Sequence, residues 1–223
     1  MRRFSLTVVT LRLLLLIGGT ISLDSRADSS RLVENLTDSN LSQCIKALML
    51  EHQWQTPAEV EAIKCHNEDI LSTEGLQQFN NIKVLSLYNN NIKSIDLSKL
   101  KKLETVNLAA NQLQQLTVSQ LPKLTRLYIF KNRLTSLHLA NLPALEQVKA
   151  NDNKLESLMI TSTPHLAKFY LFNNQLEHLE ITTLTQLSYL DVRQNPMPDE
   201  FYDFLDEQSD LTARHDGNAD DWE

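Results

Sequence analysis

The segment LYIFKNRLTSLHL (residues 127–139) returns 42 residues later as FYLFNNQLEHLEI (residues 169–181). In both copies leucine-like residues alternate with other side chains, an asparagine follows, and the alternation then resumes. Alternation with a period of two is typical of a β-strand with one buried face. The two copies belong to a longer series, because asparagine recurs every 21 residues, at Asn90, Asn111, Asn132, Asn153, Asn174 and Asn195.

The same aliphatic pattern surrounds these asparagines, with few departures. In the first full unit it consists of Ile82, Leu85, Leu87, Ile92, Ile95, Leu97 and Leu100. A fixed period of this length predicts a solenoid, in which each unit is one coil. The residues before the asparagine form a short strand, and stacked coils pair these strands into a parallel sheet. The second alternation in each unit (95–97, 116–118, 137–139, 158–160 and 179–181) predicts another extended segment on the opposite side, because 21 residues leave no room for a long helix.

The recurring asparagine is predicted to end each strand and to form a ladder through the stack. Its amide both donates and accepts hydrogen bonds. Coils stacked about 4.8 Å apart bring it within reach of backbone groups of its turn and of the next coil. A turn without it would bury unpaired backbone groups, at about 1–3 kcal/mol.

Over residues 60–197 the sequence resembles bacterial leucine-rich repeat proteins of the short 21-residue subclass, to which the internalins are distantly similar. The resemblance rests on the period and on the form N-x-I-x-x-I-D-L around Asn90. It implies an α/β repeat solenoid with a parallel sheet on its concave face and short extended segments on the opposite side. Such solenoids serve many partners, so the resemblance fixes the fold more closely than the function.

A stack of coils needs a cap at each end, since its terminal coils would otherwise expose the core. We predict an N-terminal helical cap over residues 28–59. Its helix covers SNLSQCIKALMLEHQW (39–54), with Asp38 or Ser39 as N-cap. The following TPAE (56–59) fits a capping box, with Thr56 as N-cap and Glu59 as its partner.

The first strand is expected within VEAIKC (60–65), with Val60, Ile63 and Cys65 facing inward. The chain has two cysteines, Cys44 in the cap helix and Cys65 in this strand. An even count in an exported chain favours a disulfide, although two buried free thiols remain the alternative. A bridge would join the cap to the first coil and stabilise by about 3 kcal/mol. Its position resembles the N-terminal caps of exported bacterial members of the family.

The C-terminal end is predicted to begin after residue 197, where Pro196 and Pro198 end the pattern. DEFYDFLDE (199–207) fits a short helix that lays Phe201, Phe204 and Leu205 over the last coil. From Ser209 onward, an acidic, largely disordered tail is expected within the terminal segment 198–223.

Residues 1–27 have the features of a signal peptide: arginines at positions 2 and 3, an apolar run containing LLLLIGG (13–19), and small residues around SRA (25–27). An uncleaved membrane anchor is the alternative, but Arg12 leaves the run short of the ~20 apolar residues that a span needs. We therefore expect a bacterial protein that is periplasmic or secreted, with no membrane span in the mature chain.

Composition and motifs narrow the function. Residues 28–223 carry 27 acidic and 17 basic residues, and ten of the acids lie in residues 198–223. The remaining body is close to neutral, which argues against a nucleic-acid partner. There is no nucleophile elbow, HExxH motif, phosphate-binding glycine loop or zinc-binding cysteine set. The sequence thus predicts neither an enzyme nor a cofactor or metal site.

The side chains between the inward-facing residues form columns on the exposed face of the sheet, and several of them are aromatic or cationic. We predict a ligand-binding surface made of these residues: Tyr88, Arg126, Tyr128, Phe130, Lys149, Lys168, Tyr170, Phe172, Tyr189 and Arg193. Rings fall on alternate coils, about 10 Å apart, which predicts grooves floored by Lys149 and Asn151 and rings that are mostly open to solvent.

Tyrosine, phenylalanine and arginine are enriched at interface hot spots, so the predicted function is recognition of a protein or peptide ligand, with a glycan as the second possibility. The alternative is a structural or accessory envelope protein whose aromatic residues simply favour strands and pack across them.

Overall fold

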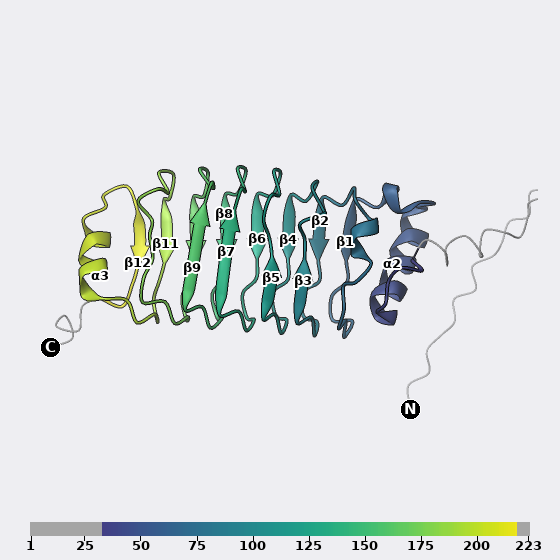
Figure 1. Cartoon of the computed structure of the whole chain (residues 1–223), viewed down its shortest axis with the longest axis horizontal. Helices are drawn as coiled ribbons and strands as arrows, with labels where there is room; N and C mark the ends of the chain where they lie inside the picture. The colour runs from purple at the N-terminus through teal and green to yellow at the C-terminus, as the bar shows by residue number, and fades with distance from the viewer. Residues whose placement is uncertain (1–32, 218–223) are drawn as a thin grey trace, which may run out of the picture.

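The computed structural model describes residues 33–217, which form one elongated stack of coils with a helix at each end (Figure 1). The predicted signal peptide and the last six residues of the predicted tail lie outside the described residues. Within residues 33–217, no helix is long and apolar enough to cross a membrane.

One long parallel sheet runs through the whole stack, as the repeat predicts. Its strands, in spatial order, are β1 (Ala62–Lys64), β2 (Val84–Ser86), β4 (Thr105–Asn107), β6 (Arg126–Tyr128), β8 (Gln147–Lys149), β10 (Lys168–Tyr170), β11 (Tyr189–Asp191) and β12 (Thr212–Arg214). The pairing of Arg126 with Gln147, and of Gln147 with Lys168, shows the in-register step of 21 residues. Side chains one period apart are therefore neighbours on the sheet.

The opposite side of the solenoid carries two shorter sheets. β3 (Ser94–Asp96) pairs with β5 (Gln115–Thr117), and β7 (Ser136–Ala140) pairs with β9 (Ser157–Thr161), all in parallel. Four of the five predicted segments are thus confirmed. The fifth, at 179–181, is not part of a strand. The core lies between the two sides and contains the aliphatic ladder together with fully buried Phe169.

The recurring asparagines form a ladder of hydrogen bonds, but the bonds between coils run to the preceding coil and not, as predicted, to the next one. The Nδ2 of Asn132 donates to the carbonyl of Ile129 in its own coil and to that of Leu108 one coil earlier, both at 3.0 Å. Its Oδ1 accepts from the N–H of Leu113 at 2.9 Å. The other five asparagines make equivalent bonds. Each amide therefore joins two coils. Five of the six asparagines are buried, and Asn153 is partly exposed.

Replacing Asn132 with alanine should lower the free energy of unfolding by about 1–3 kcal/mol, because two carbonyls and one N–H would lose their buried partner. Chemical denaturation measures this. Asn91 is the control: its amide bonds only to the side chains of Asp69 and Gln112, and its loss should cost no more than about 0.5 kcal/mol. Equal losses at the two positions would contradict the ladder.

The N-terminal cap is α2 (Ser39–His52), and the carboxylate of Asp38 caps it. One carboxylate oxygen of Asp38 accepts from the N–H groups of Asn40 and Leu41, both at 2.9 Å. The other accepts from Leu71 and Ser72 in the first coil, at 2.8 and 3.1 Å. The Cys44–Cys65 disulfide is present, with 5.9 Å between the two Cα atoms. The cap is therefore joined to the first coil twice.

The predicted capping box at 56–59 was wrong in detail. Pro57–Glu59 forms a single 3-10 turn, η1, and the Thr56 side chain does not cap it. Glu59 instead accepts from the backbone N–H of Gln55 at 2.7 Å and from the Thr56 hydroxyl at 3.2 Å. A second 3-10 turn, η2 (Leu76–Gln78), follows Gly75 in the first coil.

The C-terminal cap combines a helix with one more strand. The predicted helix is α3 (Asp199–Asp206), which buries Leu205 and also Tyr202, whose hydroxyl donates to the Asn195 carbonyl at 3.0 Å. The prediction of disorder from Ser209 was wrong for the described part of the tail, because β12 pairs with β11 and extends the long sheet. An edge that would have been left open is thereby paired by the tail itself.

Candidate functional site: an aromatic and cationic grid on the long sheet

Nine side chains on three adjacent coils form a three-by-three grid on the face of the long sheet, which we call the grid. β6, β8 and β10 carry the first two rows, and the third row lies two residues beyond the ends of these strands, where the coils stay in register. The rows are Arg126–Gln147–Lys168, Tyr128–Lys149–Tyr170 and Phe130–Asn151–Phe172. The outer strands thus repeat the order cation, tyrosine, phenylalanine, and the middle strand places amides and one lysine between them.

The middle row is organised around the Lys149 ammonium. Its Nζ lies 5.6 Å from the ring centroid of Tyr128 and 5.1 Å from that of Tyr170. Ammonium groups are attracted to the faces of aromatic rings at such distances. The Tyr128 hydroxyl also donates to Oε1 of Gln147 at 3.3 Å. The Lys149 ammonium thus lies between two tyrosine rings, one of which is also bonded to Gln147.

On the next strand, β11, a second group of predicted residues continues the surface. The Tyr189 ring is tilted against that of Tyr170, with 4.8 Å between centroids. Arg193 lies over the Phe172 ring at 5.7 Å, and it donates two hydrogen bonds to the Asp191 carboxylate at 2.9 and 2.7 Å. Burial, and secondarily the negative charge of Asp191, raise the pKa of Tyr189. Its phenol therefore stays neutral at physiological pH.

The structure corrects the prediction about exposure. Tyr128, Phe130, Tyr170 and Phe172 are half-buried. Lys149 lies over the Tyr128 and Tyr170 rings, and Arg193 lies over the Phe172 ring. The predicted groove above Lys149 is filled by its own side chain, and Asn151 is buried. The alternation of side chains along the strand predicts on which side of the sheet these residues lie. It does not predict the conformation of a long, flexible lysine side chain.

The predicted residue Tyr88 lies apart from the others. It sits at the end of β2, separated from the grid by β4, and its ring contacts that of His66 edge to face at 6.1 Å between centroids. Its side chain is 38% exposed. Gln147 and Asn151 belong to the grid but were not among the predicted ligand-binding residues, although Asn151 was predicted to floor the grooves. Their places between the outer strands follow from the same 21-residue step.

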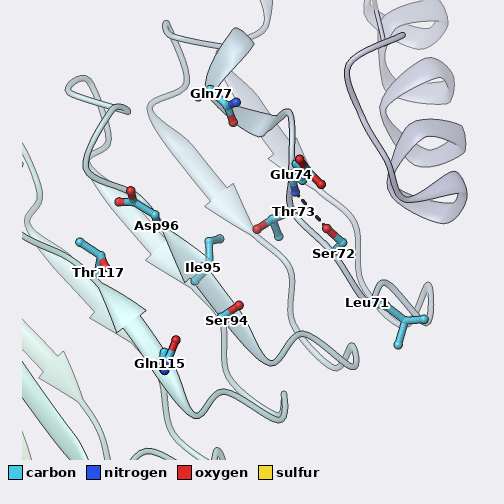
Figure 2. Close-up of a pocket in the computed structure, with 10 residues that line it drawn as sticks. All are labelled: Leu71, Ser72, Thr73, Glu74, Gln77, Ser94, Ile95, Asp96, Gln115 and Thr117. Atoms are coloured by element: carbon cyan, nitrogen blue, oxygen red, sulfur yellow. Dashed lines mark hydrogen bonds between the residues drawn. The ribbon is translucent and has the colours of Figure 1, made fainter.

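A hollow lies on the opposite side of the solenoid, beside β3 and β5 (Figure 2). It is a cavity of about 390 Å³, lined by Leu71, Ser72, Thr73, Glu74, Gln77, Ser94, Ile95, Asp96, Gln115 and Thr117. Asp38 holds the backbone of Leu71 and Ser72 at the N-cap of α2, and no strand forms there beside β3. Asp96 lies on the rim of this cavity, and its pKa is lowered chiefly by a hydrogen bond from the N–H of Ser98. The lining is mainly polar and contains no aromatic ring, so it has fewer interface anchors than the grid.

Comparison with known proteins gives the fold. Residues 80–121 match the family described as Leucine Rich repeats (2 copies). No curated protein shows a significant match. YopM from Yersinia enterocolitica is similar with 20% identity and a TM-score of 0.63, over 87% of this chain and 42% of YopM. Internalin C2 from Listeria monocytogenes is similar with 17% identity and a TM-score of 0.54, over 82% of this chain and 96% of that one.

The functional domain of InlJ from Listeria monocytogenes matches with 22% identity and a TM-score of 0.43, over 74% of this chain and 52% of that one. The chain thus spans about half the length of InlJ and less than half that of YopM. At these identities the likenesses to YopM and internalin C2 establish the architecture alone.

Proposed function

We propose that this leucine-rich repeat protein is an exported, non-catalytic recognition module, which binds a protein or peptide ligand through the grid and the adjoining residues Tyr189 and Arg193. The single observation that carries the proposal is the ordered cluster of rings and cations on one face of the long sheet. Tyrosine, phenylalanine and arginine are the residues that bind most strongly at protein interfaces. The disulfide supports export, since such bonds persist in oxidising compartments.

The contacts of the rings favour a polypeptide over a glycan. A sugar binds by stacking on an open ring face. In the grid, Tyr170 has Lys149 on one side and Tyr189 on the other, and Phe172 has Arg193 over it. These contacts cover ring surface on which a sugar would stack, whereas the side chains of a protein can pack around the parts that stay open.

The test is the double substitution Phe130→Ala with Phe172→Ala. Both rings are half-buried on the sheet face and outside the core between the sheets, so we expect the variant to fold with a modest loss of stability. Each lost ring should weaken binding of a partner by about 2 kcal/mol or more. The measurement is capture of envelope and secreted proteins of the producing bacterium by the mature protein, with mass spectrometry and titration of each captured partner.

The control is Leu71→Ala with Met159→Ala, two exposed apolar side chains away from the long sheet, at 65% and 58% exposure. It removes apolar surface without touching the grid, so capture should be unchanged. If the ring variant were strongly destabilised while capture stayed as in the wild type, the rings would serve packing, and the structural or accessory function would replace recognition.

A further inference from the structure

The exposed face of the long sheet carries three positive charges that form no salt bridge within residues 33–217. From β4 to β11, the grid positions and their equivalents contain four cations, Arg126, Lys149, Lys168 and Arg193, and one acid, Asp191. Asp191 is 2% exposed and is paired with Arg193. Within residues 33–217, none of the other three cations forms a salt bridge. A nearly neutral body therefore has an unpaired cluster of three positive charges at its most aromatic surface.

The three cations are arranged as a triangle. Arg126 and Lys168 occupy the same row on β6 and β10, about 10 Å apart, with Gln147 between them. Lys149 lies on the strand between, in the next row. It is held by two tyrosine rings, so little side-chain freedom is lost when an anion binds it. Arg126 and Lys168 are exposed and free to reach toward the same ligand.

From this arrangement we infer that the ligand is an acidic polypeptide segment. Its carboxylates contact Arg126, Lys149 and Lys168, while its apolar side chains pack on the open parts of the Phe130 and Phe172 rings. This inference rests on the proposed function, and it adds the chemistry of the partner. Two classes of anionic polymer fit less well. A nucleic acid requires a longer basic surface than three residues, and an acidic polysaccharide lacks the apolar side chains that the phenylalanine row would receive.

The experiment is selection of a displayed library of random 12-residue peptides on the intact mature protein. Selected peptides should contain more aspartate and glutamate than the library, and their binding should weaken as salt is added. The charge-reversed variant Arg126→Glu with Lys168→Glu should bind the same peptides at least about tenfold more weakly and should select basic peptides instead. Both side chains are exposed, so the variant is expected to fold.

The matched control is Lys93→Glu with Lys154→Glu, which makes the same change in net charge at exposed positions outside the grid. It should bind the acidic peptides like the wild type. Loss in both variants would show a response to net charge alone and would overturn the inference.

The remaining outcomes separate this inference from the proposed function. Selected peptides without excess acid, whose binding is nevertheless lost in the Phe130→Ala, Phe172→Ala variant, would overturn the acidic chemistry and leave recognition by the grid intact. Peptides that are indifferent to both sets of substitutions would overturn both proposals. If no peptide is enriched, the inference fails, and binding of alginate or heparin that is abolished by Arg126→Glu with Lys168→Glu would assign the surface to an acidic polysaccharide.

Discussion

Replacing Gly75 with alanine is expected to lower the free energy of unfolding by more than about 3 kcal/mol. Gly75 has a φ of +89° at the start of η2, a conformation that costs an alanine about 1–2 kcal/mol. An added Cβ would also lie 2.0 Å from the carbonyl oxygen of Asn35. Since that neighbour is backbone, the cap segment would have to move away from the first coil, as in other overpacked sites.

Chemical denaturation of the purified variant measures this loss. Gly217→Ala is the control, because Gly217 also has a positive φ, +79°, but lies near the other end of the described chain. It should cost about 1–2 kcal/mol, the backbone contribution alone. A loss at Gly75 no larger than that at Gly217 would mean that the contact with Asn35 does not constrain the cap.

The regular part of the fold could be predicted because every coil repeats the same pattern of buried and exposed residues. A residue such as Leu127 has the same neighbours as its counterparts 21 residues away, so one correct register fixes all of them. The amide of Asn132 satisfies its donors and its acceptor by bonding to backbone groups of its own coil and of the preceding coil. The rows of the grid follow from the same step, which is why the side of the sheet on which Tyr128 lies was predicted correctly.

The turns could not be predicted, because their conformation is imposed by the stack. The residue before each ladder asparagine has a φ between 54° and 56°, yet these residues are Asn89, Ala110, Lys131, Asp152, Asn173 and Gln194. None is glycine. Asn89, Asp152 and Asn173 tolerate the left-handed backbone, but Ala110, Lys131 and Gln194 carry no local signal for it. The N–H of Ala110 instead donates to the carbonyl of Phe130 in the following coil, at 2.9 Å. The bond between coils outweighs the local preference.

Strand β12 and the position of the Lys149 side chain escaped prediction for a related reason. β12 is three residues long, too short for an alternation to be recognised, and it lies in an acidic segment. It is held by the paired edge of β11 and by the stacking of His215 on Tyr202, at 5.0 Å between centroids. Lys149 likewise takes its position from two rings on neighbouring strands. Both are tertiary contacts that no single segment encodes.

Replacing Asp38 with alanine is expected to lower the free energy of unfolding by about 2–4 kcal/mol at pH 7. The carboxylate accepts four backbone hydrogen bonds, two within α2 and two from Leu71 and Ser72 in the first coil. Loss of an N-cap costs about 0.5–2 kcal/mol, and N–H groups left without partners add a further cost of similar size. The same change should release the first-coil segment that borders the hollow beside β3 and β5.

The effect should depend on pH in a defined direction. Burial alone would raise the pKa of Asp38, but the N–H groups of Leu41, Leu71, Ser72 and Asn40 outweigh it and lower the pKa. A carboxyl group whose pKa is lowered on folding stabilises the protein fully above its unfolded pKa, near 3.9. That contribution disappears as the pH falls through the lowered folded pKa. The difference between wild type and Asp38→Ala should therefore be constant from pH 7 to about pH 5 and shrink below about pH 4.

Asp96→Ala separates this effect from acid sensitivity in general. The pKa of Asp96 is also lowered, chiefly by a hydrogen bond from the backbone N–H of Ser98. However, the Asp96 carboxylate accepts only from this residue two positions away, at 2.8 Å. Such a local bond should contribute no more than about 0.5 kcal/mol to the free energy of unfolding, because the side chain is exposed and its partner is close in sequence. Unfolding curves of the three proteins at pH 7, 5, 4 and 3 would decide. A constant difference between wild type and Asp38→Ala down to pH 3 would mean that the four hydrogen bonds do not depend on the charge. If Asp96→Ala lowered the free energy of unfolding as much as Asp38→Ala does, the hydrogen bonds from Asp38 to the first coil would contribute no more than a local turn bond.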